Sequence, residues 1–265
     1  WQLTALKEGD VLFEEKPLVS AQFSWNELYK YLACEFCLKS LESAEEMVRR
    51  LANNPGLSLP HPECCDVDPS TFAQCSQCQV LYCSPVCRDL AAEQYHQVLC
   101  KGSSKDDPEH PLNRLVNEWR AFHYPPETTS VMLIAKMIAM VKQAKDKDLI
   151  VSQFSTFVKN AASEQEHIAH KLLGEQFQVQ REVLRSLVSD ALFEESVQEW
   201  FTPEGFSLLF ALVGTNGQGI ENLQLNEAEK KELDELIEKI YNEIDEVSGE
   251  FLDCEGSGLY QLQSA

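Results

Sequence analysis

The sequence has no apolar run long enough to cross a bilayer. Its longest, VMLIAKMIAMV at 131–141, is shorter than a membrane span and carries Lys136 near its centre. The chain also opens, as WQLTALKEGD, without the basic and apolar segments of a secretory signal. We therefore expect a soluble cytoplasmic protein, with the nucleus as a second compartment and no membrane partner.

Basic residues are scarce. The chain has 22 of them against 43 acidic residues, which gives a formal net charge of −21. Such a charge repels phosphate backbones, so direct nucleic-acid binding is not expected. It attracts Lys- and Arg-rich protein segments, although acidity also serves solubility, and composition alone favours that plainer role.

Internal repeats and low-complexity tracts are absent as well. With 265 residues, 44% of them hydrophobic, the chain can bury a core as one large or two ordinary domains. Cysteine, in contrast, is plentiful. Ten cysteines in a chain expected to be intracellular favour metal binding or redox chemistry over structural disulfides. A redox motif of the thioredoxin type needs one C-x-x-C in a βαβ unit, and the sequence shows no such unit.

The cysteine spacing is typical of metal ligands. Two C-x2-C pairs are followed by two further cysteines and a His-x3-Cys pair. Together they supply seven thiolates and one imidazole, enough for two closed tetrahedral zinc sites. The eight candidate ligands are Cys34, Cys37, Cys75, Cys78, Cys83, Cys87, His96 and Cys100. This spacing disfavours the alternative that they are ordinary buried cysteines. Cys64 and Cys65 are off this pattern and are interpreted as loop thiols, and Cys254 as a small core residue.

Helix geometry predicts which ligands share an ion. Ser84 followed by Pro85 marks a helix start, and PVCRDLAAEQYHQVL continues with helical character. His96 and Cys100 share one face of this helix. Cys87 lies nine residues before His96, which in an unbroken helix is ~13 Å along the axis and on the opposite face, so these two should bind different ions. The interleaved assignment is Cys34, Cys37, Cys83 and Cys87 for site one, and Cys75, Cys78, His96 and Cys100 for site two.

The rest of the chain is mostly helical in pattern, between strand-like ends. Residues 10–23 resemble short strands broken by Pro17, and 256–265 again appear extended in pattern. Apolar periodicity and caps predict helices at 110–122, at 129–144, from Thr202-Pro203 to near Gly214, and at 226–248. A Ser163–Glu166 capping box predicts the start of a long helical region that reaches about Trp200. Chain ends that pair in one sheet leave the middle free to protrude, so we expect one fold with insertions.

The order of the zinc ligands resembles the MYND finger over residues 34–100. The resemblance implies the same cross-braced pairing and a protein-docking role, often toward proline-containing peptides. The insertion 39–74 replaces the short loop usual in that family and leaves the ligand set intact. Sites closed by four protein ligands have no open position for catalysis, so both zinc ions are predicted to be structural.

The order of segments along the chain is similar to that of the SMYD family, SET-domain lysine methyltransferases with an inserted MYND finger. GDVLFEEKPLV before the finger, and FALVGTNGQGI and GSGLYQLQSA after it, carry the resemblance. It implies an α+β fold, namely a split SET-type β fold with an inserted cross-braced two-zinc MYND finger and a large helical insert. The implied domains are 1–33, the N-terminal part of the SET fold; 34–100, the finger; 101–255, the helical insert region with the Asn216 loop; and 256–265, the start of the C-terminal SET part.

The resemblance also implies an activity. A SMYD protein transfers a methyl group from S-adenosylmethionine to lysine side chains of histone, ribosomal or other non-histone proteins. The deprotonated amine must be aligned behind the sulfonium methyl at near-attack distance. The alternative function is a non-catalytic adaptor whose finger docks partner proteins.

The predicted cofactor contact is Asn216 in GTNGQGI, a position where the family touches S-adenosylmethionine. Its plainer interpretation is a turn residue in a left-handed conformation among glycines. The family's Gly-x-Gly cofactor loop would precede Trp1, and its NHSCxPN motif and channel tyrosine would follow Ala265. We therefore assign no catalytic residue and expect that the 265 residues as written do not complete a methyl-transfer site. Residues left out between Ile220 and Glu221 are a further alternative.

Overall fold

The computed structural model describes residues 7, 16–59, 62, 67–121, 130–157 and 166–217. For 27–28 and 166–176 it describes the backbone and not the side chains. The chain divides into two units, Trp1–Gly217 and Gln218–Ala265, and all described residues belong to the first. The predictions that lie outside the described residues are the strand at 10–15, the loop thiols Cys64 and Cys65, the Ser163 cap, the helix 226–248, Cys254 and the extended end 256–265.

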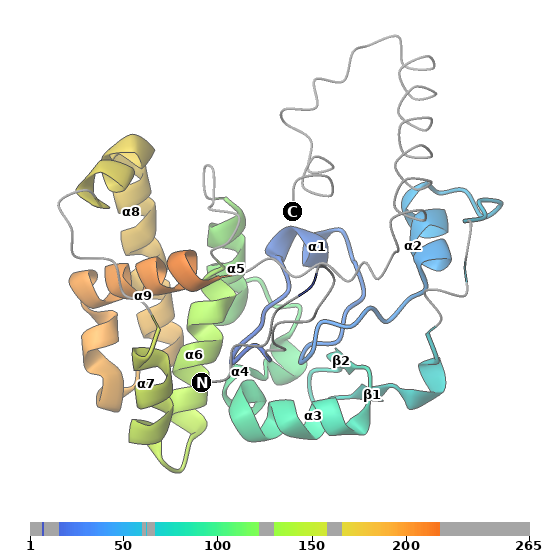
Figure 1. Ribbon diagram of the computed structural model, residues 1–265, viewed down its shortest axis with the longest axis horizontal. Helices are drawn as coiled ribbons and strands as arrows, with labels where there is room; N and C mark the ends of the chain where they lie inside the picture. The colour runs from blue at the N-terminus through green and yellow to red at the C-terminus, as the bar shows by residue number, and fades with distance from the viewer. Residues whose placement is uncertain are drawn as a thin grey trace, which may run out of the picture. The chain divides into compact units, whose positions relative to one another are not determined.

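The N-terminal part of this unit has short elements around the cysteine-rich region (Figure 1). They are α1 (Ser24–Leu28), α2 (Ala44–Leu51), the 3-10 turn η2 (Pro69–Thr71), β1 (Ala73–Gln74), β2 (Leu81–Tyr82), α3 (Pro85–Ala91), the π-helical turn η3 (Ala92–His96) and α4 (Gln97–Leu99). β1 and β2 pair antiparallel, with Ala73 opposite Tyr82. The described residues form no other sheet, so the SET-type sheet of the expected α+β fold stays a prediction.

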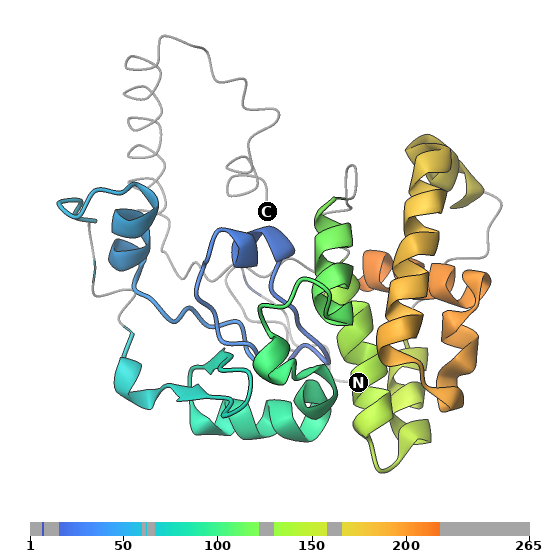
Figure 2. The ribbon, with the colours of Figure 1, turned by 180° about the vertical axis from the view of Figure 1, so that it is seen from behind.

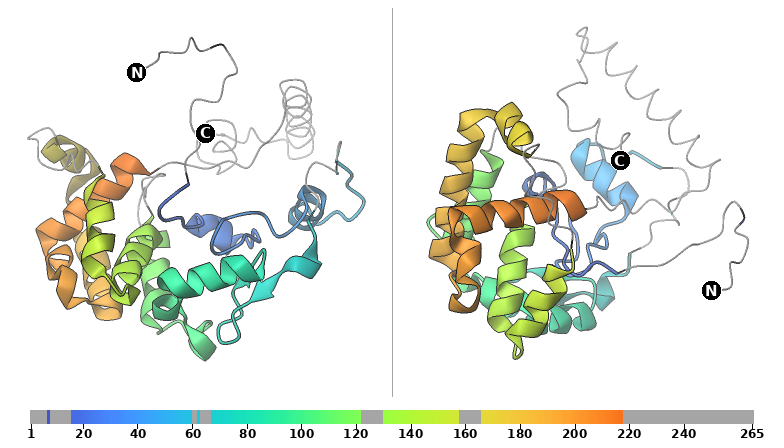
Figure 3. Two further views of the ribbon diagram at one scale, coloured as in Figure 1. Left: turned by 60° about the horizontal axis from the view of Figure 1, so that its bottom comes forward. Right: turned by 60° about the vertical axis from the view of Figure 1, so that its left-hand side comes forward.

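The C-terminal part of this unit is helical. Its elements are the 3-10 turn η4 (Gly102–Ser104), α5 (Pro111–Arg120), α6 (Val131–Gln143), α7 (Lys147–Ser155), α8 (Glu166–Leu192), the 3-10 helix η5 (Glu195–Phe201) and α9 (Pro203–Asn216). α6 contacts α5, α7, α8 and α9, and also η3 and α4 (Figures 1 and 2). α9 lies across α6 in Figure 3. α6 therefore joins the helical part to the cysteine-rich region.

The core follows from how apolar these helices are. α6 is apolar on nearly every side, and nine of its residues are buried, namely Val131 and all of 134–141. A helix can bury residues on every side only when neighbouring elements surround it. Trp119 of α5 packs against Phe210 of α9 with 6.0 Å between ring centroids. Phe154 of α7 packs edge-on against Trp200 at 6.3 Å. Each fully buried apolar side chain of this size contributes roughly 1.5–3 kcal/mol.

Helix starts agree with the predicted caps. Ser84 and Thr202 each accept a backbone N–H from the first turn of α3 and α9, and Pro follows both of them at the first helical position. Ser130 caps α6 in the same way. The predicted starts of α3 and α9 are thus confirmed, while α9 ends at Asn216, slightly beyond the expected end near Gly214.

The long helical region predicted to reach about Trp200 consists of two helices. α8 ends at Leu192, and η5 follows as a separate 3-10 helix. Glu194 explains the break, because its carboxylate accepts the backbone N–H of Ser196 (3.3 Å) and pairs with Lys147 (2.6 Å). These contacts hold the chain in an extended conformation at Glu194 and start a new helix one residue later.

The described part of the predicted N-terminal strand, residues 16–23, is irregular chain up to the start of α1. Pro17 lacks a backbone N–H and therefore cannot donate a hydrogen bond to a neighbouring strand. Ser20 bonds to other segments instead: its hydroxyl donates to the carbonyl of Phe36 (2.9 Å), and its carbonyl accepts from Nζ of Lys136 (2.9 Å). The segment is therefore fixed by side-chain contacts and not by a sheet.

The insertion 39–74 contains a helix that the sequence analysis missed. α2 begins with a complete capping box, in which the Ser43 hydroxyl accepts the N–H of Glu46 (3.2 Å) and the Glu46 carboxylate accepts the N–H of Ser43 (2.9 Å). The Ser-x-x-Glu spacing was a usable signal for this start. Arg50 in its last turn also pairs with the buried carboxylate of Glu42 (2.5 Å), which ties α2 to the chain before it.

Candidate metal centre

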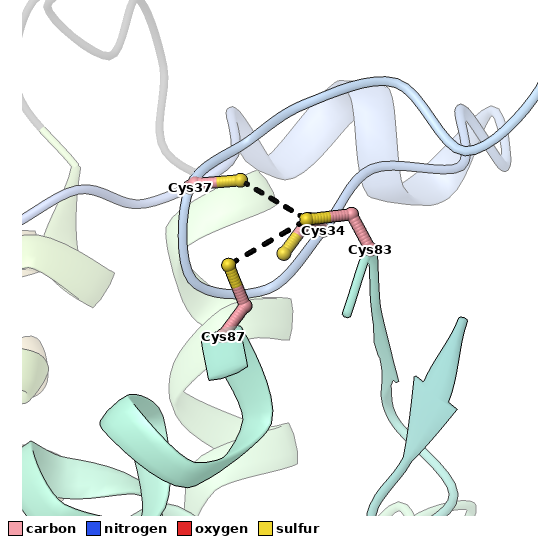
Figure 4. A group of neighbouring side chains, drawn as sticks. All are labelled: Cys34, Cys37, Cys83 and Cys87. Carbon is pink, nitrogen blue, oxygen red and sulfur yellow. Dashed lines mark hydrogen bonds between the residues drawn. The ribbon is translucent and has the colours of Figure 1, made fainter. Parts of the chain in front are cut away.

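The eight predicted ligands lie in two clusters. Cluster one is Cys34, Cys37, Cys83 and Cys87, and cluster two is Cys75, Cys78, His96 and Cys100. Within each cluster the ligand atoms all lie within 4.8 Å of one another. Figure 4 shows the four sulfur atoms of cluster one turned toward a common point. The structure thus brings together the same two groups of four that the interleaved assignment proposes.

The separations across the clusters fit tetrahedral zinc. With Zn–S near 2.3 Å and Zn–N near 2.0–2.1 Å, tetrahedral ligands lie about 3.8 Å apart for two sulfurs and about 3.6 Å for sulfur and nitrogen. The observed separations are 3.6 Å for Cys37–Cys83, 3.5 Å for Cys83–Cys87, 3.8 Å for Cys75–Cys100 and 3.5 Å for Cys78 Sγ–His96 Nε2. A disulfide would need about 2.05 Å. The donor set and its geometry therefore suit a structural zinc ion in each cluster.

The two C-x2-C pairs form the same tight turn. The N–H of Leu38 donates to the carbonyl of Cys34 (3.0 Å), and the N–H of Gln79 donates to the carbonyl of Cys75 (2.9 Å). Leu38 and Gln79 each follow the second cysteine of a pair, and both have φ of 62°. Non-glycine residues adopt this conformation at a cost of roughly 1–2 kcal/mol. The strain is tolerated twice because this turn directs both sulfurs of a pair to one side.

Backbone donors tune the thiols of cluster two. Burial alone would raise the pKa of the Cys75 thiol, but the backbone N–H groups of Cys78 and Gln77 outweigh it and lower that pKa to about 6. Burial raises the pKa of Cys78 to about 12, and the nearby Cys75 and Cys100 sulfurs add to the rise. Without a cation the cluster thus resists full deprotonation, and a divalent ion would supply the missing positive charge.

The helix that carries His96 is not the unbroken α-helix expected from the sequence. η3, Ala92–His96, is a π-helical turn, and Cys100 lies after the helix in an extended conformation (φ −70°, ψ 112°). A π turn holds more residues than an α turn, which changes the direction of each side chain after it, and both Tyr95 and His96 are buried. The assumed 3.6-residue phase between Cys87 and His96 was therefore wrong, whereas their separation into two clusters is observed.

Contacts from α6 support the π turn. Nε2 of Gln143 donates to the carbonyl of Ala92 (2.6 Å) and also to that of Glu93. The hydroxyl of Tyr95 donates to the carbonyl of Glu35 (3.1 Å), which lies inside the first C-x2-C turn. His96 is held edge-on against Tyr82, with 5.9 Å between ring centroids. The π turn is thus fixed by tertiary contacts.

Lys136 and Glu35 are contacts that sequence reasoning missed. Lys136 of α6 is only 2% exposed, and its Nζ donates to the carboxylate of Glu35 (2.8 Å) and to the carbonyls of Glu35 (3.0 Å) and Ser20 (2.9 Å). The same Nζ lies 4.7 Å from the centre of the Tyr95 ring. The lysine that interrupts the longest apolar run therefore anchors cluster one to the helical core. A buried lysine within an apolar helix requires an acidic partner. The sequence alone does not identify Glu35 as that partner, because it lies about a hundred residues away along the chain.

Asn216 lies in the last turn of α9, and its Nδ2 donates to the carbonyl of Leu212 (2.8 Å). It is absent from the described residues with positive φ, so its interpretation as a left-handed turn residue was wrong. The side chain is half-buried. Its predicted contact with a cofactor stays a prediction.

Known proteins match the chain over nearly its whole length. The human (Homo sapiens) protein-lysine N-trimethyltransferase SMYD5 is 54% identical over 271 residues, which cover 98% of this chain and 65% of that protein. The proteins of the same name from Gallus gallus and Danio rerio are 54% and 52% identical, with the same coverage. The chain is thus similar to SMYD5 proteins over nearly all of its length. It spans 65% of the length of these curated SMYD relatives.

Other comparisons add no further likeness. No protein-family model matches the chain, and no solved structure does. Among the described residues, no helix combines the length and the apolarity that a membrane crossing needs. The likeness to known proteins therefore rests on the SMYD5 relatives, and the site geometry on the two cysteine clusters.

His96→Ala should empty one cluster and spare the other. The variant loses the imidazole of cluster two, whereas cluster one keeps its four thiolates, so about one zinc ion per chain should remain by elemental analysis. His96→Cys is the matched control, because it restores a fourth ligand and should retain about two ions. Anomalous scattering that placed Cys83, Cys87, His96 and Cys100 around one metal would contradict the assignment.

Proposed function

We propose that the protein carrying this chain is a protein-lysine N-methyltransferase that uses S-adenosylmethionine. The observation that supports the proposal is the 52–54% identity over 98% of the chain to relatives named protein-lysine N-trimethyltransferase. S-adenosylmethionine supplies a methyl group on a sulfonium. The substrate lysine amine forms the new N–C bond, the S–C bond breaks, and S-adenosylhomocysteine leaves with the electron pair.

The surface charge supports basic protein substrates. A formal charge of −21 raises the local concentration of Lys-rich segments and speeds their encounter with the protein. Histone, ribosomal and other non-histone proteins are the substrate classes we propose, in the cytoplasm and also in the nucleus. Asn216, in the last turn of α9, is the residue we assign to cofactor binding.

In the same proposal the two clusters hold structural Zn²⁺. Each would be closed by four protein ligands, so neither ion has a coordination position left for a substrate. The fold is proposed to be a split SET-type fold, with the finger at 34–100 and a helical region from 101 to 255 inserted between its parts at 1–33 and 256–265. The finger would then dock partners, including proline-containing peptides.

A methyl-transfer assay tests this function. The intact protein, incubated with methyl-labelled S-adenosylmethionine and separate pools of histones and ribosomal proteins, should label lysine side chains in at least one pool. Mass spectrometry then gives the substrate lysine and the number of methyl groups. Asn216→Ala should raise the KM for S-adenosylmethionine, and the exposed Lys145→Gln should leave that KM unchanged.

A non-catalytic adaptor is the competing outcome of this assay. Closed four-ligand clusters, with docking as the finger's implied role, would suit an adaptor equally well. Absence of label from every pool, with both zinc ions bound and S-adenosylmethionine binding undetectable by calorimetry, would favour it.

A further inference from the structure

A cavity of about 280 Å³ opens between the chain that leaves the cysteine-rich region and α5. Its walls come from the segment 101–108, which includes η4, and from one face of α5. The lining residues are Lys101, Lys105, Asp106, Pro108, Asn113, Val116, Asn117 and Arg120. None of them belongs to either cysteine cluster.

The charge of this cavity is opposite to that of the chain. The lining has three basic residues, Lys101, Lys105 and Arg120, and one acidic residue, Asp106. Arg120 is engaged elsewhere as well, since its Nε donates to the carbonyl of Ser24 (3.2 Å). The whole chain has 43 acidic residues against 22 basic ones. The basic lining is therefore a local feature, opposite in sign to the net charge of the chain.

The two lysines of the cavity lack carboxylate partners among the described residues. Nζ of Lys101 donates to Oδ1 of Asn113 (2.8 Å), and Nζ of Lys105 donates to Oε1 of Gln79 (2.8 Å). Neutral amide oxygens orient an ammonium group and leave its charge uncompensated. Lys147, in contrast, pairs with Glu194 at 2.6 Å.

The cavity wall is held in shape without a ligand. Nδ2 of Asn113 donates to the carbonyls of Lys105 (2.9 Å) and Asp107 (2.7 Å), while its Oδ1 accepts from Lys101. One side chain on α5 therefore fixes both the 104–107 segment and the Lys101 ammonium group. Because these groups are already ordered, a ligand that binds to them loses less free energy to conformational entropy.

We propose that this cavity binds a single phosphate group carried by an otherwise neutral or basic segment of a partner protein. A phosphorylated side chain carries about −1.5 to −2 charge at neutral pH, which the ammonium groups of Lys101 and Lys105 can balance. A phosphate has oxygen acceptors for both ammonium groups together. The net charge of −21 repels polyanions on approach, so a nucleic acid is disfavoured and an isolated phosphate among neutral or basic residues is favoured.

Fluorescence anisotropy with labelled peptides tests the proposal on the full chain. A peptide with one phosphoserine among Lys and Gly residues should bind more tightly than its unphosphorylated form and than the same peptide with Glu, and inorganic phosphate should compete. Lys101→Gln/Lys105→Gln should weaken binding of the phosphopeptide about tenfold or more, as expected for lost charged hydrogen bonds. Asn117→Asp, which adds a negative charge to the lining, should weaken it as well.

The matched control is Lys16→Gln/Lys145→Gln, which removes two exposed lysines outside the cavity and changes the net charge equally. This variant should bind like the parent, and all variants should keep the same zinc content and circular dichroism. Equal weakening by both double variants, equal binding of the unphosphorylated or Glu peptide, or failure of inorganic phosphate to compete would overturn the proposal. So would tight binding of a short RNA that depends on Lys101 and Lys105.

Discussion

Removal of metal from the two clusters is expected to unfold residues 34–100. Structural zinc contributes on the order of 10–16 kcal/mol in small metal-folded modules, and the secondary structure within this region is sparse. Its sheet is a pair of two-residue strands, and α3 spans only Pro85–Ala91. Hydrogen exchange followed by mass spectrometry should show slow exchange with zinc and fast exchange across 73–100 after chelation.

The same experiment should report on α6. Gln143 and Lys136 lose their partners when η3 and the first C-x2-C turn unfold, so exchange in α6 should also rise. α8, whose main contacts are with α5, α6, α9 and η5, serves as the internal control. Unchanged protection of 73–100 in metal-free protein would show that the fold does not depend on zinc.

Glu35→Ala is expected to destabilise the protein, because it leaves the buried ammonium group of Lys136 without a counter-charge. The loss should fall below the roughly 3–5 kcal/mol typical of breaking a fully buried ion pair, since the Glu35 side chain is 30% exposed and the carbonyl of Ser20 still accepts from Lys136. Lys136→Met should cost less, since it removes the charge itself and fills the space with a side chain of similar length. Urea unfolding at a fixed free zinc concentration measures both effects. Elemental analysis must show that both variants keep their metal.

The double variant Glu35→Ala/Lys136→Met separates this ion pair from general damage to the turn. If the pair acts as a unit, the double variant should be more stable than Glu35→Ala alone, because the uncompensated charge is gone. Additive losses in the double variant would mean that the two side chains contribute independently, and the anchoring role of Lys136 would then be wrong.

Local signals predicted much of this structure. Ser-Pro and Thr-Pro pairs marked the starts of α3 and α9, and the C-x2-C spacing indicated the two turns that aim pairs of sulfurs. Each of these signals acts within a few residues, so one sequence suffices to find it. The Ser43–Glu46 capping box was a signal of the same kind, and α2 could have been predicted from it.

The missed features depend on residues distant in the chain. The π turn at Ala92–His96 is supported by Gln143 of α6, and the burial of Lys136 depends on Glu35. The chain around Ser20 is irregular because Lys136 and Phe36 take its polar groups. The hydrophobic pattern of a segment cannot identify such partners, because it depends only on residues close together along the chain.

The π turn also makes the protein unequally tolerant of insertions and deletions. Closing a loop that is already long costs little more entropy when residues are added, so homologues could change the length of the stretch between α2 and η2 at small cost. Loss of one residue from Ala92–His96 would instead restore ordinary helical phase and swing His96 roughly 100° away from cluster two. We therefore expect homologues to differ in the length of the stretch between α2 and η2 and to keep the length of η3.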